Sequence, residues 1–319
     1  MAYTSGDLIL RDHYNTFATG NADGTANNAV ANINTIWGVG NGTYGYGQST
    51  VLTAVNAGDI VTATQWSTLI ARLNSILTHQ SGAGSGITSP VTGATVTALS
   101  TLSTSITTAY NNRANFNNTR SAVTSDSNRN GIWSSDAPTT FQQVRTVTFA
   151  SADAARYFFN AGGRLQLKLS ATGAAGTTKE LTWVTLISNL AAMNLDFTTS
   201  GRTGTGATLT TDGSSIGYWD LTTTDQTLIR LTEDTAPYTT NTLDVLCRVA
   251  GAAGTNGGLG TQVIFTVNYN DAATDSTMGP PSWNDNINLT INCNVDVYKP
   301  EAVNLSDVVG SVTVASTTN

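Results

Sequence analysis

Strict alternation of apolar and polar residues is clearest in INLTINCNVDVY, residues 287–298. From Ile287 to Val297 every second side chain is apolar, which is the pattern of a β-strand with one face in a core. Shorter alternating runs precede it from about residue 141, separated by Gly, Asn, Asp and Pro clusters: QVRTVTF, RLQLKLSAT, YWDLTTT, TLIRLTED, TLDVLCRVA and TQVIFTVNYN. The sequence therefore predicts an antiparallel β-sandwich domain over residues 136–302.

One helix and a tail accompany these strands. In KELTWVTLISNLAAMNL, residues 179–195, apolar side chains recur at helical spacing, which predicts a helix inserted among the strands. Its expected apolar stripe consists of Leu181, Val184, Ile187 or Ser188, and Ala191, with Trp183 beside it. Residues 303–319 are predicted to form a C-terminal arm, with one more strand as the alternative.

The N-terminal quarter contains the same pattern twice. GDLILRDHYNTF, residues 6–17, and GDIVTATQWSTL, residues 58–69, share Gly-Asp, two apolar residues and a large apolar pair three positions apart. The second copy continues into a helical apolar face, and a hydroxyl at Thr62 or Thr64 can cap the start of that helix. Residues 1–80 are thus predicted to be a helical docking region with two related units, residues 6–37 and 58–77.

The segment between these two regions is rich in small polar residues. QSGAGSGITSP, residues 80–90, has the composition of a linker, and a Thr/Ser-rich helix is expected after it as far as about residue 113. Residues 81–135 are therefore interpreted as a linker with one helix, and the fold class of the whole chain as α+β.

Charged residues make up 11% of the 319 residues, and 14 basic against 21 acidic side chains give a net charge of −7. No Lys/Arg cluster is present, which argues against a nucleic-acid partner. No apolar run approaches the roughly 18 residues of a membrane span, and MAYTSGDLIL lacks the features of a signal peptide. No membrane insertion is expected. A polar but weakly charged surface of Thr, Ser, Asn and Gly suits a protein held in an assembly.

The residue types that usually carry chemistry are scarce. His13 and His79 have no partner at zinc-ligand spacing, and Cys247 and Cys293 lie in strand-like runs that favour buried free thiols, with a disulfide left open. No nucleophile elbow or phosphate-binding loop is present. The sequence predicts neither an enzyme nor a bound cofactor.

DSNRNG, residues 126–131, resembles the first half of a calcium-binding loop. Asp126, Asn128 and Asn130 supply oxygens at the right spacing, but the Glu expected at the twelfth loop position is replaced by Ala137. An Asx-rich turn is the favoured interpretation, and the three residues remain a weak calcium candidate.

Several aromatic and acidic residues of the β-rich region are candidates for a carbohydrate site. The aromatic candidates for stacking on sugar rings are Trp133, Trp219, Tyr238 and Trp283. The candidates for the paired carboxylates of a glycoside hydrolase are Asp220, Glu233, Asp234 and Asp244. Core packing for the former and solvated turns for the latter are the competing interpretations, and no catalytic site emerges.

ADAARYFFNAGGRLQL, residues 152–167, resembles a segment of virion structural proteins of tailed bacteriophages, especially the tail, neck and fibre-associated proteins of marine and cyanobacterial phages. The two N-terminal units are similar to short helical modules of such proteins. The resemblance implies a structural subunit that is assembled in the host cytoplasm, located in the virion, and bound to other virion proteins and to copies of itself. It carries over no catalytic residues.

Large apolar side chains are the candidates for assembly contacts: Tyr14, Phe17, Trp66, Leu69, Ile70, Leu73, Phe158 and Phe159. Packing inside a helical unit is the equal alternative for the helical ones. Phe158 and Phe159 are expected on opposite faces of an extended segment that turns at Gly162 and Gly163. Other functions left open are a host-glycan receptor-binding protein, a capsid-surface decoration protein and, last, a polysaccharide hydrolase.

Overall fold

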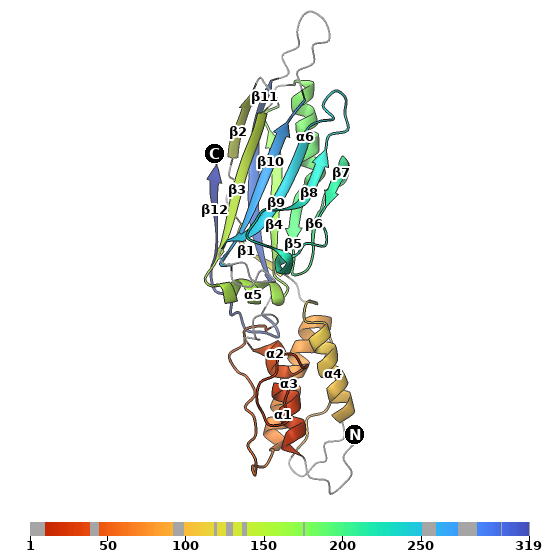
Figure 1. Ribbon diagram of the computed structural model, residues 1–319, viewed down its shortest axis with the longest axis vertical. Coiled ribbons are helices and arrows are strands. Elements are labelled where there is room, and N and C mark those ends of the chain that lie inside the picture. Colours follow the sequence, from red (N-terminus) through yellow and green to blue (C-terminus); the bar gives the residue numbers. More distant parts are fainter. Residues whose placement is uncertain are drawn as a thin grey trace, which may run out of the picture. The chain divides into compact units, whose positions relative to one another are not determined.

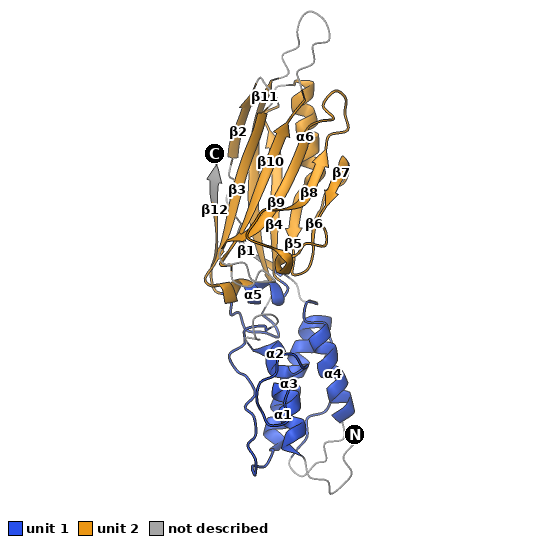
Figure 2. Cartoon of the chain, in the orientation of Figure 1, with its two compact units in different colours: residues 1–120, 156–162, 300–309 blue, residues 121–155, 163–299, 310–319 orange. Residues whose placement is uncertain are grey.

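The computed structural model describes residues 10–38, 45–91, 99–117, 120–125, 130–135, 139–174, 176–250, 260–273, 286–300 and 302–318. The chain forms two compact units, which Figure 2 colours blue and orange. Unit 1 consists of residues 1–120, 156–162 and 300–309, and unit 2 of residues 121–155, 163–299 and 310–319. Unit 1 is helical and unit 2 is a β-sandwich, which confirms the α+β fold class.

Unit 1 is built from short helices (Figure 1). Their bounds are α1 Arg11–Thr19, α2 Ile33–Trp37, α3 Ala63–Ser81, α4 Leu99–Asn111 and α5 Ala152–Asn160, of which the residues from Arg156 onward belong to this unit. Phe158 and Phe159 therefore lie on a helix, fully buried and packed edge to face with 5.0 Å between ring centroids. The prediction of an extended segment with these rings on opposite faces is wrong.

The two related sequences start their helices at the same position. α1 begins at Arg11 and α3 at Ala63, which are equivalent residues of the two copies. Thr62 forms a capping box with Gln65, as the sequence suggested, because its side chain accepts a hydrogen bond from the Gln65 N–H and the Gln65 side chain accepts one from the Thr62 N–H. The copies then differ, since α1 ends at the left-handed Gly20 whereas α3 continues to Ser81.

The aromatic residues of the two copies pack against each other. Tyr14 and Phe17 contact Trp66 edge-on, with ring centroids 5.6 Å and 6.2 Å from it. The α3 side chains that follow are also buried: Leu69, Ile70 and Leu73. These residues form the core of unit 1, so within this fold they present no surface to a partner, apart from the partly buried Phe17.

Side-chain amides hold the loops of unit 1 in place. Asn15 accepts a hydrogen bond from the Val55 N–H (2.9 Å) and donates one to the Val55 carbonyl (3.0 Å), as a neighbouring strand would. Asn34 does the same to Leu52, and Gln48 to Ser306. We call these three pairs the amide clamps. They satisfy backbone groups of segments that have no sheet or helix partners.

Unit 2 consists of two antiparallel sheets whose strands lie over one another in Figure 1. The first has the order β1-β11-β4-β5-β6, with β2 also paired to β11. Its strands are β1 Arg120–Ser125, β2 Asn130–Ser135, β4 Arg164–Thr172, β5 Ala192–Leu195, β6 Ser200–Arg202 and β11 Ile287–Pro300. The second has the order β12-β3-β10-β9-β8-β7. Its strands are β3 Thr139–Phe149, β7 Thr208–Asp212, β8 Gln226–Thr232, β9 Thr242–Ala250, β10 Gln262–Asp271 and β12 Val312–Thr318.

The C-terminal segment is a strand, since β12 pairs with β3 from Val312 opposite Phe149 to Thr318 opposite Gln143. The alternating pattern also holds, because Ile287, Leu289, Ile291, Cys293, Val295 and Val297 are all buried. The prediction from alternation is thus confirmed for β11, whose apolar face lies in the core.

An aromatic cluster joins both sheets to the inserted helix α6, Thr178–Leu190. Trp133 of β2 stacks on Phe141 of β3 at 5.8 Å and meets Trp183 of α6 edge-on at 4.8 Å and Tyr269 of β10 at 6.0 Å. Two polar side chains of β3 also point between the sheets, where Gln143 and Arg145 donate hydrogen bonds to backbone carbonyls of β11. We refer to Trp133, Phe141, Trp183 and Tyr269 as the aromatic cluster.

The buried face of α6 differs from the expected stripe. The buried apolar side chains are Trp183, Leu186, Ile187 and Leu190. Leu181, predicted to be in the stripe, is 52% exposed, and Val184 is half-buried. Apolar side chains cover most of the circumference of α6, so the periodicity of its sequence does not determine which face is buried. Contact with the strands determines it.

Candidate functional site

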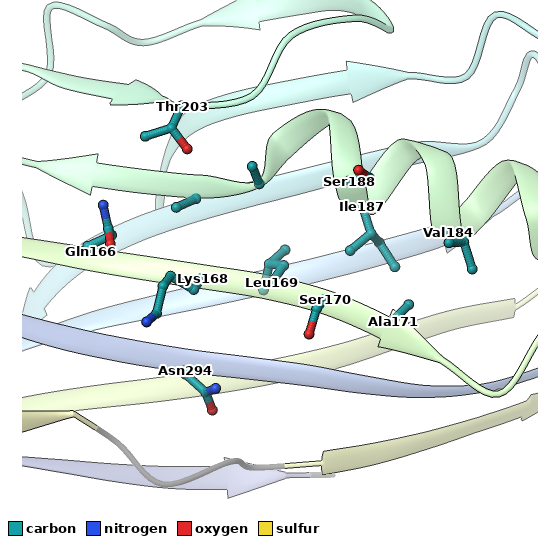
Figure 3. Close-up of a pocket in the computed structure, with 12 residues that line it drawn as sticks. Gln166, Lys168, Leu169, Ser170, Ala171, Val184, Ile187, Ser188, Thr203 and Asn294 are labelled. Atoms are coloured by element: carbon teal, nitrogen blue, oxygen red, sulfur yellow. The ribbon is translucent and has the colours of Figure 1, made fainter.

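A hollow of about 720 Å³ lies between β4 and α6 in unit 2 (Figure 3). Its lining residues are Gln166, Lys168, Leu169, Ser170, Ala171, Val184, Ile187, Ser188, Ala191, Ala192, Thr203 and Asn294. Amide and hydroxyl groups and the Lys168 ammonium line it together with aliphatic side chains. None of these residues was singled out from the sequence as a site residue, although the alternation of RLQLKLSAT places Gln166, Lys168 and Ser170 on one face.

The hollow exists because a helix replaces a strand beside β4. β5 pairs with β4 only from Leu165 to Lys168, and beyond that point α6 runs along the rest of β4. The change takes place at Ala191, whose carbonyl accepts a hydrogen bond from the Leu169 N–H at 3.2 Å. A helix is thicker than a strand and does not follow the hydrogen-bonding edge of β4, so the surface beside it is left open.

A network of polar side chains covers the sheet next to the hollow. The Lys168 Nζ lies 2.5 Å from Oδ2 of Asp296, a carboxylate that is 5% exposed. The Tyr298 hydroxyl contacts the same oxygen at 3.3 Å and Gln166 at 3.4 Å, and Gln166 donates to Asn194 at 2.8 Å. Burial, and next the charge of Asp296, raise the pKa of Tyr298, so its hydroxyl keeps its proton at neutral pH.

This arrangement suits binding better than proton transfer. The residues that line the hollow include no His, Cys, Asp or Glu, and Lys168 is engaged with Asp296. Fixed amides and hydroxyls beside aliphatic carbons match a small neutral ligand that carries several hydroxyl groups.

Ala191 at the rim of the hollow has a strained backbone. Its φ of 56° and ψ of −73° lie in a region that residues with a Cβ rarely adopt. We expect Ala191→Gly to raise the unfolding free energy of unit 2 by about 1 kcal/mol, measured by urea unfolding. Ala192→Gly, in the extended first residue of β5, is the matched control and is expected to be destabilising. Equal effects of the two changes would contradict the assignment of strain to Ala191.

The calcium candidate gains no support. Asp126 and Asn128 lie outside the described residues, and Asn130 begins β2 opposite Asn292. Among the described residues, no group of three His, Cys, Asp or Glu side chains could hold a metal ion.

The aromatic residues proposed to stack on sugars are not exposed where they are described. Trp133, Trp219 and Tyr238 are 3%, 7% and 2% exposed, which agrees with packing, the interpretation that the sequence favoured for each of them over sugar stacking. Trp283 lies outside the described residues. Core packing was the competing interpretation, and it accounts for Trp133 through the aromatic cluster.

Three of the four carboxylates considered for hydrolysis have structural partners, and the fourth, Asp234, is exposed. Asp244 pairs with Arg230 through two hydrogen bonds of 2.7 Å, Glu233 accepts one from the Thr235 N–H, and Asp220 one from the Gly217 N–H. Asp244 and Glu233 are buried, so the expectation of solvated turn residues is wrong for these two. Cys247 and Cys293 are buried and are not joined in a disulfide, and burial raises the pKa of Cys247.

Of the two histidines, His79 is buried and His13 is half-buried. His79 lies in the last turn of α3, with Tyr46 at 5.2 Å and Phe116 at 5.6 Å between ring centroids. Burial lowers the pKa of His79 to about 4, and a hydrogen bond with the backbone of Ala161 opposes that shift only weakly.

His79 makes the stability of unit 1 depend on pH. Its pKa in the folded chain lies below the ordinary value of 6.5, so the unfolded chain binds the proton first. The stabilisation is complete above about pH 6.5 and is lost as the pH falls towards 4, in total about 3 kcal/mol. We expect His79→Gln to reduce the fall in the urea midpoint of unfolding between about pH 7 and about pH 5. Unfolding is measured by the helical circular dichroism signal. A slope unchanged by His79→Gln would contradict this assignment.

No family model matches the chain, and neither does any curated protein or solved structure. In the part of the chain that the structure describes, no helix combines the length and apolar character needed to cross a membrane.

Proposed function

We propose that the chain is a non-enzymatic structural component of a tailed-bacteriophage virion, in the tail, neck or fibre and attachment apparatus. The observation that carries the proposal is the segment 152–167, whose sequence resembles virion proteins. This segment supplies α5 and the start of β4, so it contributes to both compact units. The resemblance therefore covers residues that build the fold and not a peripheral loop.

The surface of the sandwich supports a role in an assembly. On the second sheet, uncharged side chains of neighbouring strands bond to each other: Gln142 with Asn268, Thr140 with Asn270, and Gln262 with Thr148. Covering such paired amides and hydroxyls with another subunit costs less desolvation free energy than covering charges. Repeated copies of a virion subunit are expected to associate by closed symmetry.

Assembly through unit 1 requires exposed apolar side chains, which most of the candidates named from the sequence are not. Most of the large apolar candidates are buried within the unit. Among its described residues, unit 1 exposes six large apolar side chains, of which Ile60 is 85% exposed: Leu10, Val30, Val51, Ile60, Val91 and Val303. We assign the contacts with copies of the chain and with other virion proteins to these residues.

The test is to look for the polypeptide in purified particles. Antibodies raised against the full chain are applied to density-purified, DNA-filled particles, with peptide mass spectrometry of the same fractions. We expect the chain in every full particle at a constant ratio to the other virion proteins, and gold label at one substructure. Full particles that lack the polypeptide would overturn the proposal.

A host-glycan receptor-binding function is the second candidate, and the hollow beside α6 favours it. Its hydroxyls and amides suit a sugar, whereas the burial of Trp133, Trp219 and Tyr238 removes these three rings as stacking surfaces. A glycan array probed with the full chain tests this candidate. Binding that is lost in Ser188→Trp, which fills the hollow, but kept in Thr185→Trp, on the same helix outside the lining, would support it. Absence of binding would reject it.

A further inference from the structure

A lysine and an aspartate form a fully buried pair inside the sandwich. The Lys179 Nζ lies 2.7 Å from Oδ2 of Asp271, and the two side chains are 1% and 0% exposed. Lys179 is in the first turn of α6, and Asp271 is the last residue of β10. Two opposite charges removed completely from water gain little over well-packed apolar residues, so a buried pair of this kind calls for a reason.

The pair lies next to the aromatic cluster. Trp183 follows Lys179 by one helical turn, and Tyr269 precedes Asp271 by two residues, so each aromatic residue shares a face with its charged neighbour. The Trp183 and Tyr269 rings are 6.4 Å apart. These rings help to exclude water from the pair.

Proton transfer within the pair produces two reactive neutral groups. When the ammonium passes a proton to Oδ2, Lys179 becomes an amine and Asp271 a carboxylic acid, and no charge remains buried. The Ala273 carbonyl accepts a hydrogen bond from Nζ at 3.3 Å and so holds one of its N–H groups. The lone pair left by the proton transfer faces Oδ2, the oxygen that took the proton, and Cγ is bonded directly to this oxygen.

Both reactants sit on fixed backbone. Asn241 Oδ1 accepts hydrogen bonds from the Ala272 and Ala273 N–H groups, each at 2.9 Å, directly after Asp271. The first turn of α6 has the capping box of Thr177 and Glu180, and Glu180 Oε1 also accepts from the Asn288 N–H at 2.8 Å. Holding an amine and an acid in contact in this way replaces a bimolecular encounter by an intramolecular one.

We propose that Lys179 and Asp271 join in an isopeptide bond. The Nζ lone pair attacks Cγ of the protonated Asp271 carboxyl group and forms the N–C bond. The carboxyl OH then departs with a second proton from Nζ, so one water molecule is released and a neutral secondary amide remains. The sum is ammonium plus carboxylate to amide plus water, with no oxidant, reductant or cofactor. Both oxygens of the Glu180 carboxylate already accept hydrogen bonds from backbone N–H groups, so Glu180 does not relay protons between Lys179 and Asp271. We therefore expect the reaction to be slow and its product to accumulate with time.

The bond would tie the inserted helix to the centre of the second sheet. It closes a covalent loop between α6 and β10, which restricts the unfolded chain and slows unfolding in the way that a disulfide does. Such a cross-link requires no oxidising compartment, whereas a disulfide does.

Mass spectrometry of the full chain tests the proposal. After incubation at neutral pH, we expect the intact mass to be lower by one water molecule, and a protease digest to contain a branched peptide that joins Lys179 to Asp271. Lys179→Arg keeps the positive charge but lacks the amine, so its digest should contain no branched peptide. In Asp271→Asn the same attack releases ammonia, and the mass should fall by one ammonia instead.

The chain also contains an internal control. Lys168 and Asp296 are even closer, at 2.5 Å against 2.7 Å for the buried pair, but the Lys168 side chain is 45% exposed and remains hydrated. We expect no branched peptide from this pair in the digest that reveals the buried one. A wild-type digest without the Lys179–Asp271 peptide after prolonged incubation would overturn the proposal, whether or not the variants fold. Equal cross-linking of both pairs would overturn burial as its cause.

Discussion

Trp66→Ala is expected to lower the unfolding free energy of unit 1 by about 3 to 5 kcal/mol. The Trp66 ring is fully buried and contacts Tyr14 and Phe17 from the other copy of the repeated sequence. Its removal takes away apolar burial and leaves a cavity that α1 and α3 cannot close without losing the contact between the two copies. Urea unfolding followed by the helical circular dichroism signal measures the loss.

Ile60→Ala provides the matched control for this change. Ile60 lies just before α3 and is 85% exposed, so the expected effect is within about 0.5 kcal/mol. A comparable loss from both substitutions would show that the helical unit is not organised around the contact between its two copies.

Asn15→Asp is expected to destabilise unit 1 by about 3 to 5 kcal/mol at neutral pH, although it changes the side-chain shape very little. The amide nitrogen of Asn15 donates to the Val55 carbonyl at 3.0 Å and to the Ala22 carbonyl at 3.1 Å. A carboxylate oxygen in that position faces two carbonyl oxygens in a fully buried site, and both carbonyls lose their donor.

The pH dependence of this variant identifies the cause. Because burial favours the neutral acid, the difference between Asn15→Asp and wild type should shrink as the pH falls. Asn56→Asp introduces the same charge at an exposed position and is expected to leave the urea midpoint nearly unchanged. A loss in Asn15→Asp that is independent of pH would contradict an electrostatic origin.

Where the sequence predicted the fold correctly, the signal was local. The alternation from Ile287 to Val297 identified β11, and the paired GD motifs identified a helical region in each copy, with Thr62 or Thr64 as the expected cap of the second helix. The structure shows that Thr62 is the cap. Side-chain periodicity and capping depend on residues within one or two turns of each other, so they can be read from the chain itself.

Where the prediction failed, the same local signal was ambiguous. The aromatic pair Phe158 and Phe159 fits either a strand or a short helix, and in the structure it lies on α5. In α6, the buried face depends on which side meets the strands, and the hollow beside Ala191 depends on where β5 ends. The residues that line the hollow come from three strands (β4, β5 and β11), helix α6 and the positions Ala191 and Thr203 outside these elements, so no spacing in the sequence brings them together.

The sequence by itself determined the fold class, the alternating β11 strand and the helical character of both copies of the N-terminal pattern. The tertiary structure alone decided which distant groups meet, as for Gln48 with Ser306 and Lys179 with Asp271. The physical reason is the range of the interactions. Periodic burial follows from neighbours along the chain, whereas an amide clamp or a buried ion pair forms only after folding has closed a long loop and removed water from both partners.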